Sequence, residues 1–237
     1  YKEADMFIEI KNARKYYGEG DALVKAIDDI NLSLDEGKVY VILGPSGSGK
    51  STLLNMVGGL DSLDDGEIII SGRNISRADK KSMTEYRRED IGFVFQFYNL
   101  IPDLTVQENI EVVSDISKNP LDIEEVMTAL DIEKYRNRFP KELSGGQQQR
   151  AAIARALIKN PKILLCDELT GALDSKSSRS VLKFIEKINE QFKTTIIIIT
   201  HNEAIADMAD SVIRIKDGRI ADYTENSHKL SAEELAL

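Results

Sequence analysis

A glycine-rich stretch at Gly44–Thr52, with the sequence GPSGSGKST, limits how this chain can fold more than any other feature. It matches the pattern GxxxxGK[ST] and lies between the apolar run Val39–Leu43 and a helix-like segment at Lys50–Gly58. Glycines let the backbone curl so that several N–H groups point inward, and the start of a helix adds the positive end of its dipole. We therefore expect a strand, a loop and a helix that bind phosphate groups, rather than a chance glycine-rich turn.

The side chains of this loop have distinct expected roles. Lys50 would bring a full positive charge to the β- and γ-phosphates of a nucleoside triphosphate, and the hydroxyl of Ser51 is placed to bind Mg²⁺. The other positions would contact the phosphates mainly through the backbone. The candidate nucleotide-binding residues of the loop are Gly44, Pro45, Ser46, Gly47, Ser48, Gly49, Lys50, Ser51 and Thr52.

Short apolar runs alternate with amphipathic segments along the chain, which is typical of an α/β fold with a parallel sheet covered by helices. With Val39–Leu43, the expected strands of this sheet are Gly92–Phe95, Ile163–Asp167 and Thr195–Thr200, and the expected helices are Lys50–Gly58, Lys80–Glu89, Gly145–Ile158 and Lys176–Phe192. From Phe97 to Leu143 strand signals vanish, and helix-like segments at Thr105–Ser114, Ile123–Leu130 and Glu133–Arg138 predict a helical insert.

The two ends of the chain suggest further elements. The runs Phe7–Ile10 and Ile30–Leu34 alternate between apolar and polar residues, as in a small antiparallel sheet, and Glu67–Ser71 is a further strand. Near the other end, Val212–Ile215 and Ile220–Tyr223 are joined by an Asp-Gly pair and predict a hairpin. Ser231 and Glu234 have capping-box spacing, which predicts a short terminal helix.

A second candidate site is the apolar run Ile163–Cys166, which ends in two carboxylates, Asp167 and Glu168. Ligands of parallel α/β sheets bind beyond the carboxyl ends of the strands. We expect Asp167 to hold Mg²⁺, directly or through water, and Glu168 to orient or deprotonate an attacking water. The alternative is a solvated acidic turn, which the phosphate-binding loop earlier in the chain disfavours.

The segment Leu143–Gln147, with the sequence LSGGQ, is a second start of a helix that suits an anion. Ser144 is a good N-cap, and Gly145 and Gly146 leave the first N–H groups of the helix bare. Because one chain's phosphates are already held by Gly44–Thr52, we infer that Ser144, Gly145, Gly146 and Gln147 serve a nucleotide bound to another subunit. An ordinary capped helix is the alternative.

Together and in this order, these three segments resemble the nucleotide-binding domains of ABC transporters, over about 7–222 of the chain. LSGGQ followed by Gln148–Arg150 is similar to that family's signature motif. The resemblance implies a P-loop NTPase of the RecA-like type, with a parallel-sheet core, an N-terminal antiparallel β subdomain and an α-helical insert. It implies one ATPase domain at 6–225, with the core at 6–96 and 144–225, the insert at 97–143 and a C-terminal tail at 226–237.

The resemblance also implies ATP and Mg²⁺ as cofactors and assigns further residues. Gln96 is similar to the Q-loop glutamine, which contacts Mg²⁺ or the attacking water, and His201 to the switch histidine at the γ-phosphate; with Glu168 they form the catalytic set. Asp174 ends a segment similar to the D-loop, which meets the opposite subunit. Tyr17 is similar to the aromatic residue that stacks on adenine, and the adjacent Tyr16 is its alternative.

Within the family, Asp28–Leu32, Ile91–Pro102 and Gly171–Lys176 resemble the branch that serves macrolide export and lipoprotein release. This implies an ATP-dependent homodimer that energises a separate integral membrane permease and exports a peptide, antibiotic or lipoprotein-like substrate. The alternative from the same branch is a signalling ATPase of a permease-like cell-division complex. One departure is Leu169, because the family usually has Pro after the catalytic Glu; we expect it to affect the stiffness of the loop more than the reaction.

Composition narrows the expected partners. The net charge is −9, which is unlike a general nucleic-acid binder and disfavours an ABC protein that acts on DNA or ribosomes. A P-loop kinase or GTPase would not explain LSGGQ. The apolar runs fall short of the about 20 residues of a membrane span, the first seven residues do not suit a signal peptide, and the single cysteine, Cys166, excludes an internal disulfide. We therefore expect a cytoplasmic protein, peripheral on the inner face of the cell membrane.

Overall fold

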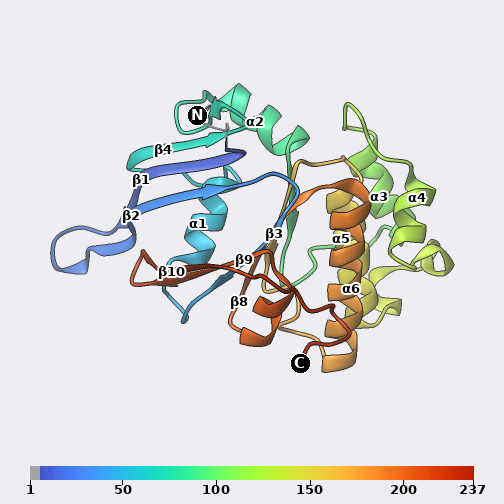
Figure 1. The fold of residues 1–237 in the computed structure, drawn as a ribbon. Coiled ribbons are helices and arrows are strands. Elements are labelled where there is room, and N and C mark those ends of the chain that lie inside the picture. Colours follow the sequence, from blue (N-terminus) through green and yellow to red (C-terminus); the bar gives the residue numbers. More distant parts are fainter. Residues whose placement is uncertain (1–5) are drawn as a thin grey trace.

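The computed structural model describes residues 6–237, and a six-stranded sheet lies at its centre (Figure 1). The strand order is β10-β9-β3-β8-β7-β6. The five strands β9, β3, β8, β7 and β6 are parallel to one another, and β10 runs antiparallel to β9. The strands are β3 (Val39–Leu43), β6 (Ile91–Val94), β7 (Ile163–Asp167), β8 (Thr195–Thr200), β9 (Ser211–Lys216) and β10 (Arg219–Glu225).

Three central strands place the candidate site at one edge of this sheet. β3 leads into the loop 44–49 and helix α1 (Lys50–Val57), β7 is followed by Glu168, and β8 is followed by His201. Every residue of β3 and β8 is buried, as expected of apolar strands that are covered on both faces. Parallel strands end at a common edge, so residues far apart in the sequence meet there.

An antiparallel sheet of order β2-β1-β4-β5 forms a second layer, with α1 between the sheets (Figure 1). Its strands are β1 (Ile8–Tyr17), β2 (Val24–Leu34), β4 (Asp65–Ile70) and β5 (Arg73–Asn74). The sequence predicted only parts of β1 and β2. Near Asn12 and Asp29, which have φ of 49° and 68°, the register shifts and the apolar alternation breaks, although the ladder continues.

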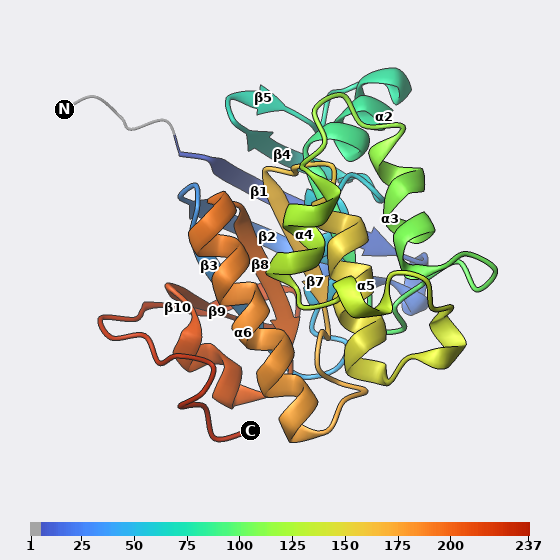
Figure 2. The ribbon, with the colours of Figure 1, turned by 90° about the vertical axis from the view of Figure 1, so that its right-hand side faces the viewer.

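Helices cover the opposite face of the central sheet (Figure 2). They are α3 (Val106–Ser114), α4 (Ile123–Ala129), α5 (Gly145–Leu157) and α6 (Ser175–Phe192), while α2 (Lys80–Glu89) precedes β6. Short 3₁₀ turns occur at Gly20–Ala22, Glu133–Tyr135, Pro140–Glu142 and Glu203–Met208. The predicted helix at Glu133–Arg138 is wrong beyond its first turn, because the carbonyls of Arg136 and Arg138 accept hydrogen bonds from the start of α3.

The core is divided into two apolar clusters, one on each face of the central sheet. The C-terminal residues join the helical side, where Ala232 and Leu235 are buried. The predicted terminal helix is wrong: the Glu234 carboxylate does bond back to Ser231, but the carbonyl of Leu235 accepts from Arg179 of α6, and only a turn forms. In residues 6–237 no helix has both the length and the apolar character that crossing a membrane requires.

Candidate nucleotide-binding site

The loop between β3 and α1 is held in a fixed curve by the side chain of Lys50. Its ammonium group donates to the carbonyl oxygens of Gly44 and Pro45 at 2.7 and 2.8 Å, and the residue is only 7% exposed. Gly49 is the N-cap of α1 and has φ of 104°, a value that L side chains rarely adopt. The loop therefore surrounds the ammonium group and presents the start of α1 to any bound anion.

Two glycines of the loop are required by close backbone contacts. A Cβ atom on Gly44 would lie 2.2 Å from the carbonyl oxygen of Ile215 in β9, and one on Gly49 would lie 2.2 Å from the carbonyl oxygen of Ala26 in β2. Neither neighbour can give way, because both are backbone atoms. The loop thus packs against β2 of the antiparallel sheet and against β9, and any side chain at these positions would push it out of shape.

A pocket of about 430 Å³ opens beside the loop and gathers several of the predicted residues. The lining contains the loop and α1 residues together with Gln96 after β6, Glu168 after β7 and His201 after β8. Its residues are Ala26, Ser46, Gly47, Gly49, Lys50, Ser51, Thr52, Gln96, Glu168 and His201. The pocket combines a phosphate-binding loop with a carboxylate, an amide and an imidazole, which suits reactions of a bound phosphate.

Glu168 is held in an unusual conformation that directs it to this pocket. Its φ is 51°, which is uncommon for a residue with a side chain and fits a strained position at a functional site. Nδ1 of His201 lies 3.1 Å from Oε1 and 3.0 Å from Oε2 of Glu168, but only the contact to Oε1 has hydrogen-bond geometry. The next residue, Leu169, is buried in the core, so packing fixes the chain here without a proline.

Burial governs the charges of the site. It lowers the pKa of Lys50, although the charges of Glu168 and Asp167 act in the opposite direction. Burial also raises the pKa of Asp167, as does the charge of Glu168, while a hydrogen bond from Ser51 and the charge of Lys50 lower it. The pKa values of Lys50 and Asp167 are thus set by burial and by neighbouring charges, which a bound anion or cation would change.

One buried oxygen atom of a pocket residue, Oε2 of Glu168, has no hydrogen-bond partner within residues 6–237; Oγ of Ser48 is also unpaired, but it lies near Gly44 and Ser48 does not line the pocket. Unpaired buried polar atoms are costly, so they suit a site that is completed by a ligand or a water molecule. Ser51, Asp167 and Gln96 add oxygen donors, the ligand type that Mg²⁺ prefers. The residues present therefore fit a phosphate group and a magnesium ion.

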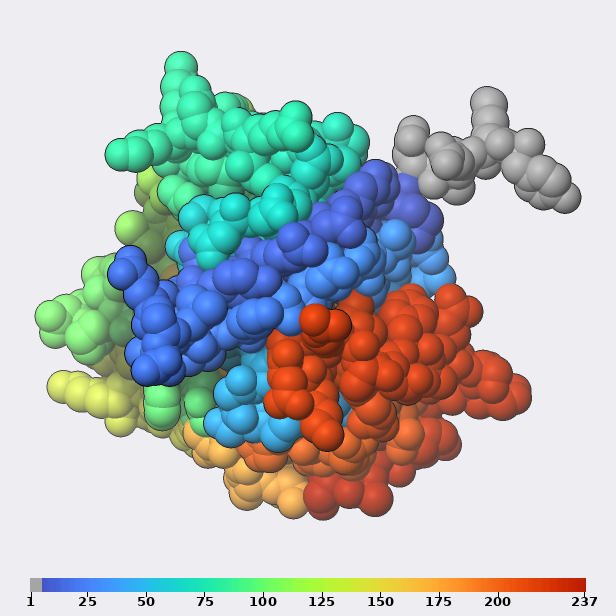
Figure 3. Space-filling model, turned by 90° about the vertical axis from the view of Figure 1, so that its left-hand side faces the viewer, coloured from blue at the N-terminus to red at the C-terminus, as the bar shows by residue number. Residues whose placement is uncertain are grey.

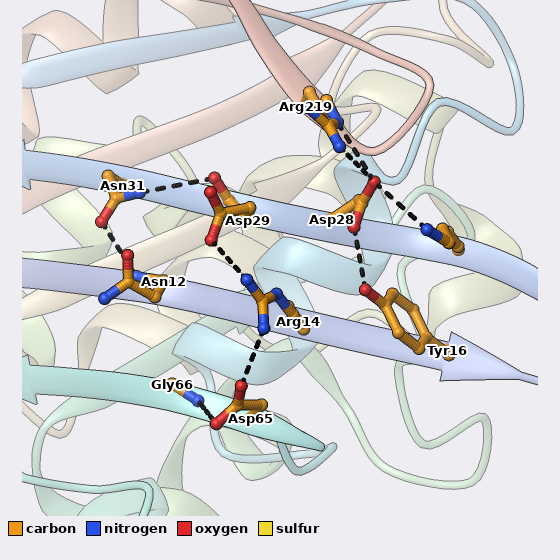
Figure 4. Close-up of polar contacts among 10 residues, drawn as sticks. Asn12, Arg14, Tyr16, Asp28, Asp29, Asn31, Asp65, Gly66 and Arg219 are labelled. Carbon is orange, nitrogen blue, oxygen red and sulfur yellow. Dashed lines mark hydrogen bonds and ion pairs between the residues drawn. The ribbon is translucent and has the colours of Figure 1, made fainter.

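The two candidate adenine platforms lie in different surroundings at the end of β1. The hydroxyl of Tyr16 donates to Asp28 at 2.8 Å, and the ammonium group of Lys25 lies over its ring (Figure 4). Tyr17 is 43% exposed, and its hydroxyl donates to Asp61 at 2.5 Å. Neither tyrosine lines the pocket, and a lysine ammonium group lies over the ring of each, but Tyr17 is the more exposed of the two, which favours it as the base-stacking residue.

The signature segment is well formed but lies outside this chain's own pocket. Ser144 caps α5 by accepting from the N–H of Gln147 at 3.4 Å, and the Gln147 side chain accepts from the N–H of Ser144 at 2.9 Å. The expectation that the first N–H groups are bare thus fails for Gln147, because a capping box uses its N–H. Neither these residues nor Gly145 and Gly146 line the pocket of 430 Å³.

Asp174 has a structural role in this chain. It is the N-cap of α6, and its carboxylate accepts from the N–H of Ser177 at 3.0 Å and from the hydroxyl of Ser177 at 2.7 Å. The preceding loop does reach the site, because a Cβ on Gly171 would lie 3.0 Å from Nε2 of Gln96. The D-loop segment is therefore connected to the pocket through Gly171 rather than through Asp174.

The residues that support the loop from outside were not predicted from the sequence. Ala26 lines the pocket, and Asp28, Asp61 and Arg219 hold the surrounding strands and tyrosines. Asp28 begins the segment Asp28–Leu32, which resembles one branch of the family, but no local motif assigns any of these residues a role at the loop. The only signal was the apolar spacing of β2, which predicted a strand but not its contact with the loop.

The strand, loop and helix with a buried lysine, together with carboxylates after a parallel strand, define a P-loop nucleotide-binding protein. Its α/β fold, with an antiparallel β subdomain, is the one expected from the sequence. The family model described as "ABC transporter" matches residues 27–171. The chain belongs to the ABC transporter family, and its ATP-binding cassette is the part seen in this structure.

Curated relatives cover most of the chain. The "Uncharacterized ABC transporter ATP-binding protein MJ0796" of Methanocaldococcus jannaschii is 41% identical, over 90% of this chain and 94% of that protein. The "Putative ABC transporter ATP-binding protein MG065 homolog" of Mycoplasma pneumoniae is 40% identical over 98% of this chain, and the "Macrolide export ATP-binding/permease protein MacB" of Pasteurella multocida is 43% identical over 96%. The chain spans only 51% and 36% of those two proteins.

Solved structures share the fold. A dimeric structure of MJ0796 has a TM-score of 0.82 and 40% identity, and covers 92% of this chain and 98% of its own. A dimeric post-hydrolysis state of MJ0796 bound to ADP and Pi also has a TM-score of 0.82, with 39% identity and the same shares of the two chains. The cbiO1 protein of Clostridium perfringens has a TM-score of 0.84 at 28% identity, over 93% of this chain and 89% of its own.

Proposed function

We propose that this chain binds and hydrolyses ATP as the motor subunit of an ABC transporter. The observation that carries the proposal is the pocket that brings Lys50, Glu168 and His201 together, in which the buried Oε2 of Glu168 has no hydrogen-bond partner. A triphosphate in the loop would place its terminal phosphate toward these side chains. The dimeric MJ0796 cassette bound to ADP and Pi has the same fold, which supports the proposal.

The loop residues would hold the triphosphate. Backbone N–H groups of 44–52 and the charge of Lys50 bind the phosphates, and Tyr17 stacks on the adenine ring. Mg²⁺ would be held by Ser51 and Asp167, with Gln96 nearby, and would neutralise phosphate charge. Lys50, Ser51 and Gln96 line the pocket and Ser51 is hydrogen-bonded to Asp167, which supports the assignments to phosphate and Mg²⁺.

Glu168 is the proposed base for the attacking water. Its free Oε2 can accept a proton from water, and His201 holds the carboxylate through Oε1 at 3.1 Å. General-base catalysis of this kind contributes about 10²–10⁴-fold. His201 is 72% exposed on its side chain, so it is free to turn toward the γ-phosphate when ATP is bound.

The working form is proposed to be an ATP-dependent homodimer. Ser144, Gly145, Gly146 and Gln147 lie outside the chain's own pocket, and the start of α5 is suited to an anion held by another subunit. ATP bound in the loop of one subunit would be covered by these residues of the other, with Asp174 and its loop at the same interface. The dimeric structures of MJ0796 support this arrangement.

An integral membrane permease is the proposed partner, which would place the protein at the inner face of the cell membrane. We assign its docking site to the insert at 97–143, because several apolar side chains there are exposed: Phe97 (77%), Ile101, Val112 and Ile116. Phe97 directly follows Gln96, so docking would be sensed at the pocket. The relative named for macrolide export favours export of an antibiotic-like, peptide or lipoprotein-like substrate over a signalling role.

Replacing the proposed base tests this function. Glu168→Gln keeps the shape of the side chain but cannot accept a proton, so we expect phosphate release from Mg-ATP to fall by at least about 100-fold. ATP binding should remain, and the variant should accumulate as an ATP-bound dimer. Phosphate release and sedimentation with and without Mg-ATP measure the two effects.

Glu203→Gln is a matched control, since Glu203 is an exposed carboxylate that pairs with Arg214 outside the pocket. It should hydrolyse ATP and sediment like the wild type. A Glu168→Gln variant with unchanged turnover would remove Glu168 from the reaction. A wild type that binds no ATP at all would refute the proposed function.

A further inference from the structure

A buried aspartate in β2 joins this N-terminal strand to the C-terminal β9–β10 hairpin, beside the nucleotide-binding loop. Asp28 in β2 is 8% exposed, and its Oδ2 accepts from Nε and Nη2 of Arg219 at 3.1 and 2.7 Å. Its Oδ1 accepts from the hydroxyl of Tyr16 at 2.8 Å. Figure 4 shows Asp28 between Tyr16 and Arg219, which lie on opposite sides of it. The two partners of the ion pair are 191 residues apart in the sequence.

The residue before Arg219 contacts the nucleotide-binding loop directly. The N–H of Gly218 donates to the carbonyl oxygen of Ser48 at 3.0 Å, and the carbonyl of Gly218 accepts from the N–H of Asp28 at 2.8 Å. A Cβ on Gly218 would lie 2.7 Å from the carbonyl oxygen of Lys25. The β9–β10 turn is therefore inserted between β2 and the loop, and Figure 3 shows the C-terminal hairpin lying against the N-terminal strands.

The nucleotide-binding loop contacts both β2 and the β9–β10 hairpin at one further position each. Gly49 packs against the carbonyl of Ala26, two residues before Asp28, and Gly44 packs against the carbonyl of Ile215 in β9. Any widening between β2 and the β9–β10 hairpin would thus move the backbone that shapes the loop. The contact between Asp28 and Arg219 is the charged link that holds these two surfaces together.

The electrostatics show that this link is an ion pair under ordinary conditions. The hydrogen bond from Arg219 lowers the pKa of Asp28, and the bond from Tyr16 acts in the same direction. The other cation nearby, Lys25, is more distant, at 3.8 Å from Oδ2. Removing Arg219 would leave a largely buried carboxylate with a weaker set of partners, which is unfavourable, and the strands would move to hydrate it.

We propose that Asp28 and Arg219 are positioning residues for ATP binding, which hold the β9–β10 turn against the nucleotide-binding loop. This inference rests on the proposed function. Neither residue lines the pocket, and we assign neither of them a contact with the nucleotide. Their contribution is to keep the loop curved before ATP arrives, so their loss weakens the binding of ATP and leaves the chemical step of bound ATP unchanged.

The test compares Arg219→Gln with Arg14→Gln. Arg14 is a matched control, because it also forms ion pairs with aspartates, Asp29 and Asp65, but these pairs link strands within the antiparallel sheet and do not link that sheet to the hairpin (Figure 4). We expect Arg219→Gln to raise KM for Mg-ATP by about tenfold, the order of one hydrogen bond to a charged group, with kcat within about twofold. Arg219→Lys should recover most of the affinity, and Arg14→Gln should match the wild type.

Hydrogen exchange supplies a readout that does not depend on turnover. In Arg219→Gln without nucleotide, the amides of 44–51 should exchange faster than in the wild type, while those of β7 and β8 keep their protection. A wild type that fails to bind ATP refutes the proposed function, not this inference. The inference is overturned if the wild type binds ATP and Arg219→Gln binds it equally well, if Arg14→Gln is impaired to the same degree, or if Arg219→Lys is no better than Arg219→Gln.

Discussion

At the scale of single residues, the two adjacent tyrosines at the end of β1 have different contacts and therefore different roles. Tyr16 is bonded to Asp28 and belongs to the contact that supports the loop. Tyr17 is bonded to Asp61, and the ammonium group of Lys15 lies 5.4 Å from the centroid of its ring while pairing with Asp61 at 3.2 Å. The Tyr17 ring is therefore held at its hydroxyl and under one face, and it remains 43% exposed for a base.

Removing the Tyr17 ring should weaken ATP binding. Stacking of a base on an aromatic ring contributes about 1–3 kcal/mol, so Tyr17→Ala should raise the Kd for ATP by about 5- to 150-fold. Tyr17→Phe keeps the ring and should lose much less. Tyr223→Ala removes an equally exposed tyrosine from β10 and should have no effect. Titration with a fluorescent ATP analogue measures all three, and equal affinity of Tyr17→Ala and the wild type would exclude Tyr17 as the platform.

Contiguous residues of the site could be predicted from the sequence, and distant ones could not. The loop 44–52, Asp167 and Glu168 are marked by local patterns that the chemistry of phosphate requires, and their roles stay predictions that the pocket supports. Asp28 and Arg219 have no such pattern. Their pairing depends on the order of strands in two sheets and on a hairpin at the far end of the chain, which no local spacing reveals.

At the scale of elements, the limits of most helices and of the central strands followed from local sequence more closely than those of β1 and β2. Thr105 and Glu108 form the capping box that begins α3, and their hydrogen bonds involve neighbours in the sequence. The limits of β1 and β2 depend on pairing across the sheet, which continues through bulges where the apolar alternation fails. The segment 133–138 shows the same effect, because tertiary hydrogen bonds to α3 replace those of a helix.

The start of α3 depends on one buried side chain, Asn109. Its amide group accepts from the N–H of Ile101 at 2.8 Å and donates to the carbonyls of Ile101, Leu104 and Thr105 at 3.0–3.1 Å. These bonds fix the loop 101–105, which precedes α3 in the segment that follows Gln96. The loop 101–105 has no regular secondary structure. The Asn109 side chain therefore supplies the hydrogen-bond partners that the backbone of a strand or helix would otherwise provide.

Asn109→Ala should therefore destabilise the protein. It would leave several buried backbone groups without partners, and the free energy of unfolding should fall by about 1–3 kcal/mol. Asn137→Ala, at an exposed position in the same insert, should change it by less than about 0.5 kcal/mol. Urea unfolding followed by circular dichroism measures both, and equal stability of the two variants would contradict the role assigned to Asn109.

At the scale of the whole molecule, the residues expected to contact ATP lie on two separate surfaces of the chain. The pocket contains the loop, Glu168 and His201, whereas Ser144 and the start of α5 lie outside it. Gly145 is packed against the hydroxyl of Tyr98 and against Leu173, where its missing Cβ would lie 2.9 and 3.1 Å from those side chains. The signature segment is therefore attached to the segments that follow Gln96 and Glu168, so its position can respond to changes at both.

A mixture of two inactive variants tests whether two chains share each site. Lys50→Met disables the loop, and Ser144→Arg blocks the signature surface, so each homodimer should be inactive. In a dimer of the two, one site carries both defects and the other carries neither, and ATP hydrolysis should rise well above that of either variant alone. Mixing Lys50→Met with Glu168→Gln is the control, because both defects lie on the loop side and every site then keeps one of them. If the first mixture forms mixed dimers yet gains no activity, each chain acts on its own nucleotide and the shared site is refuted.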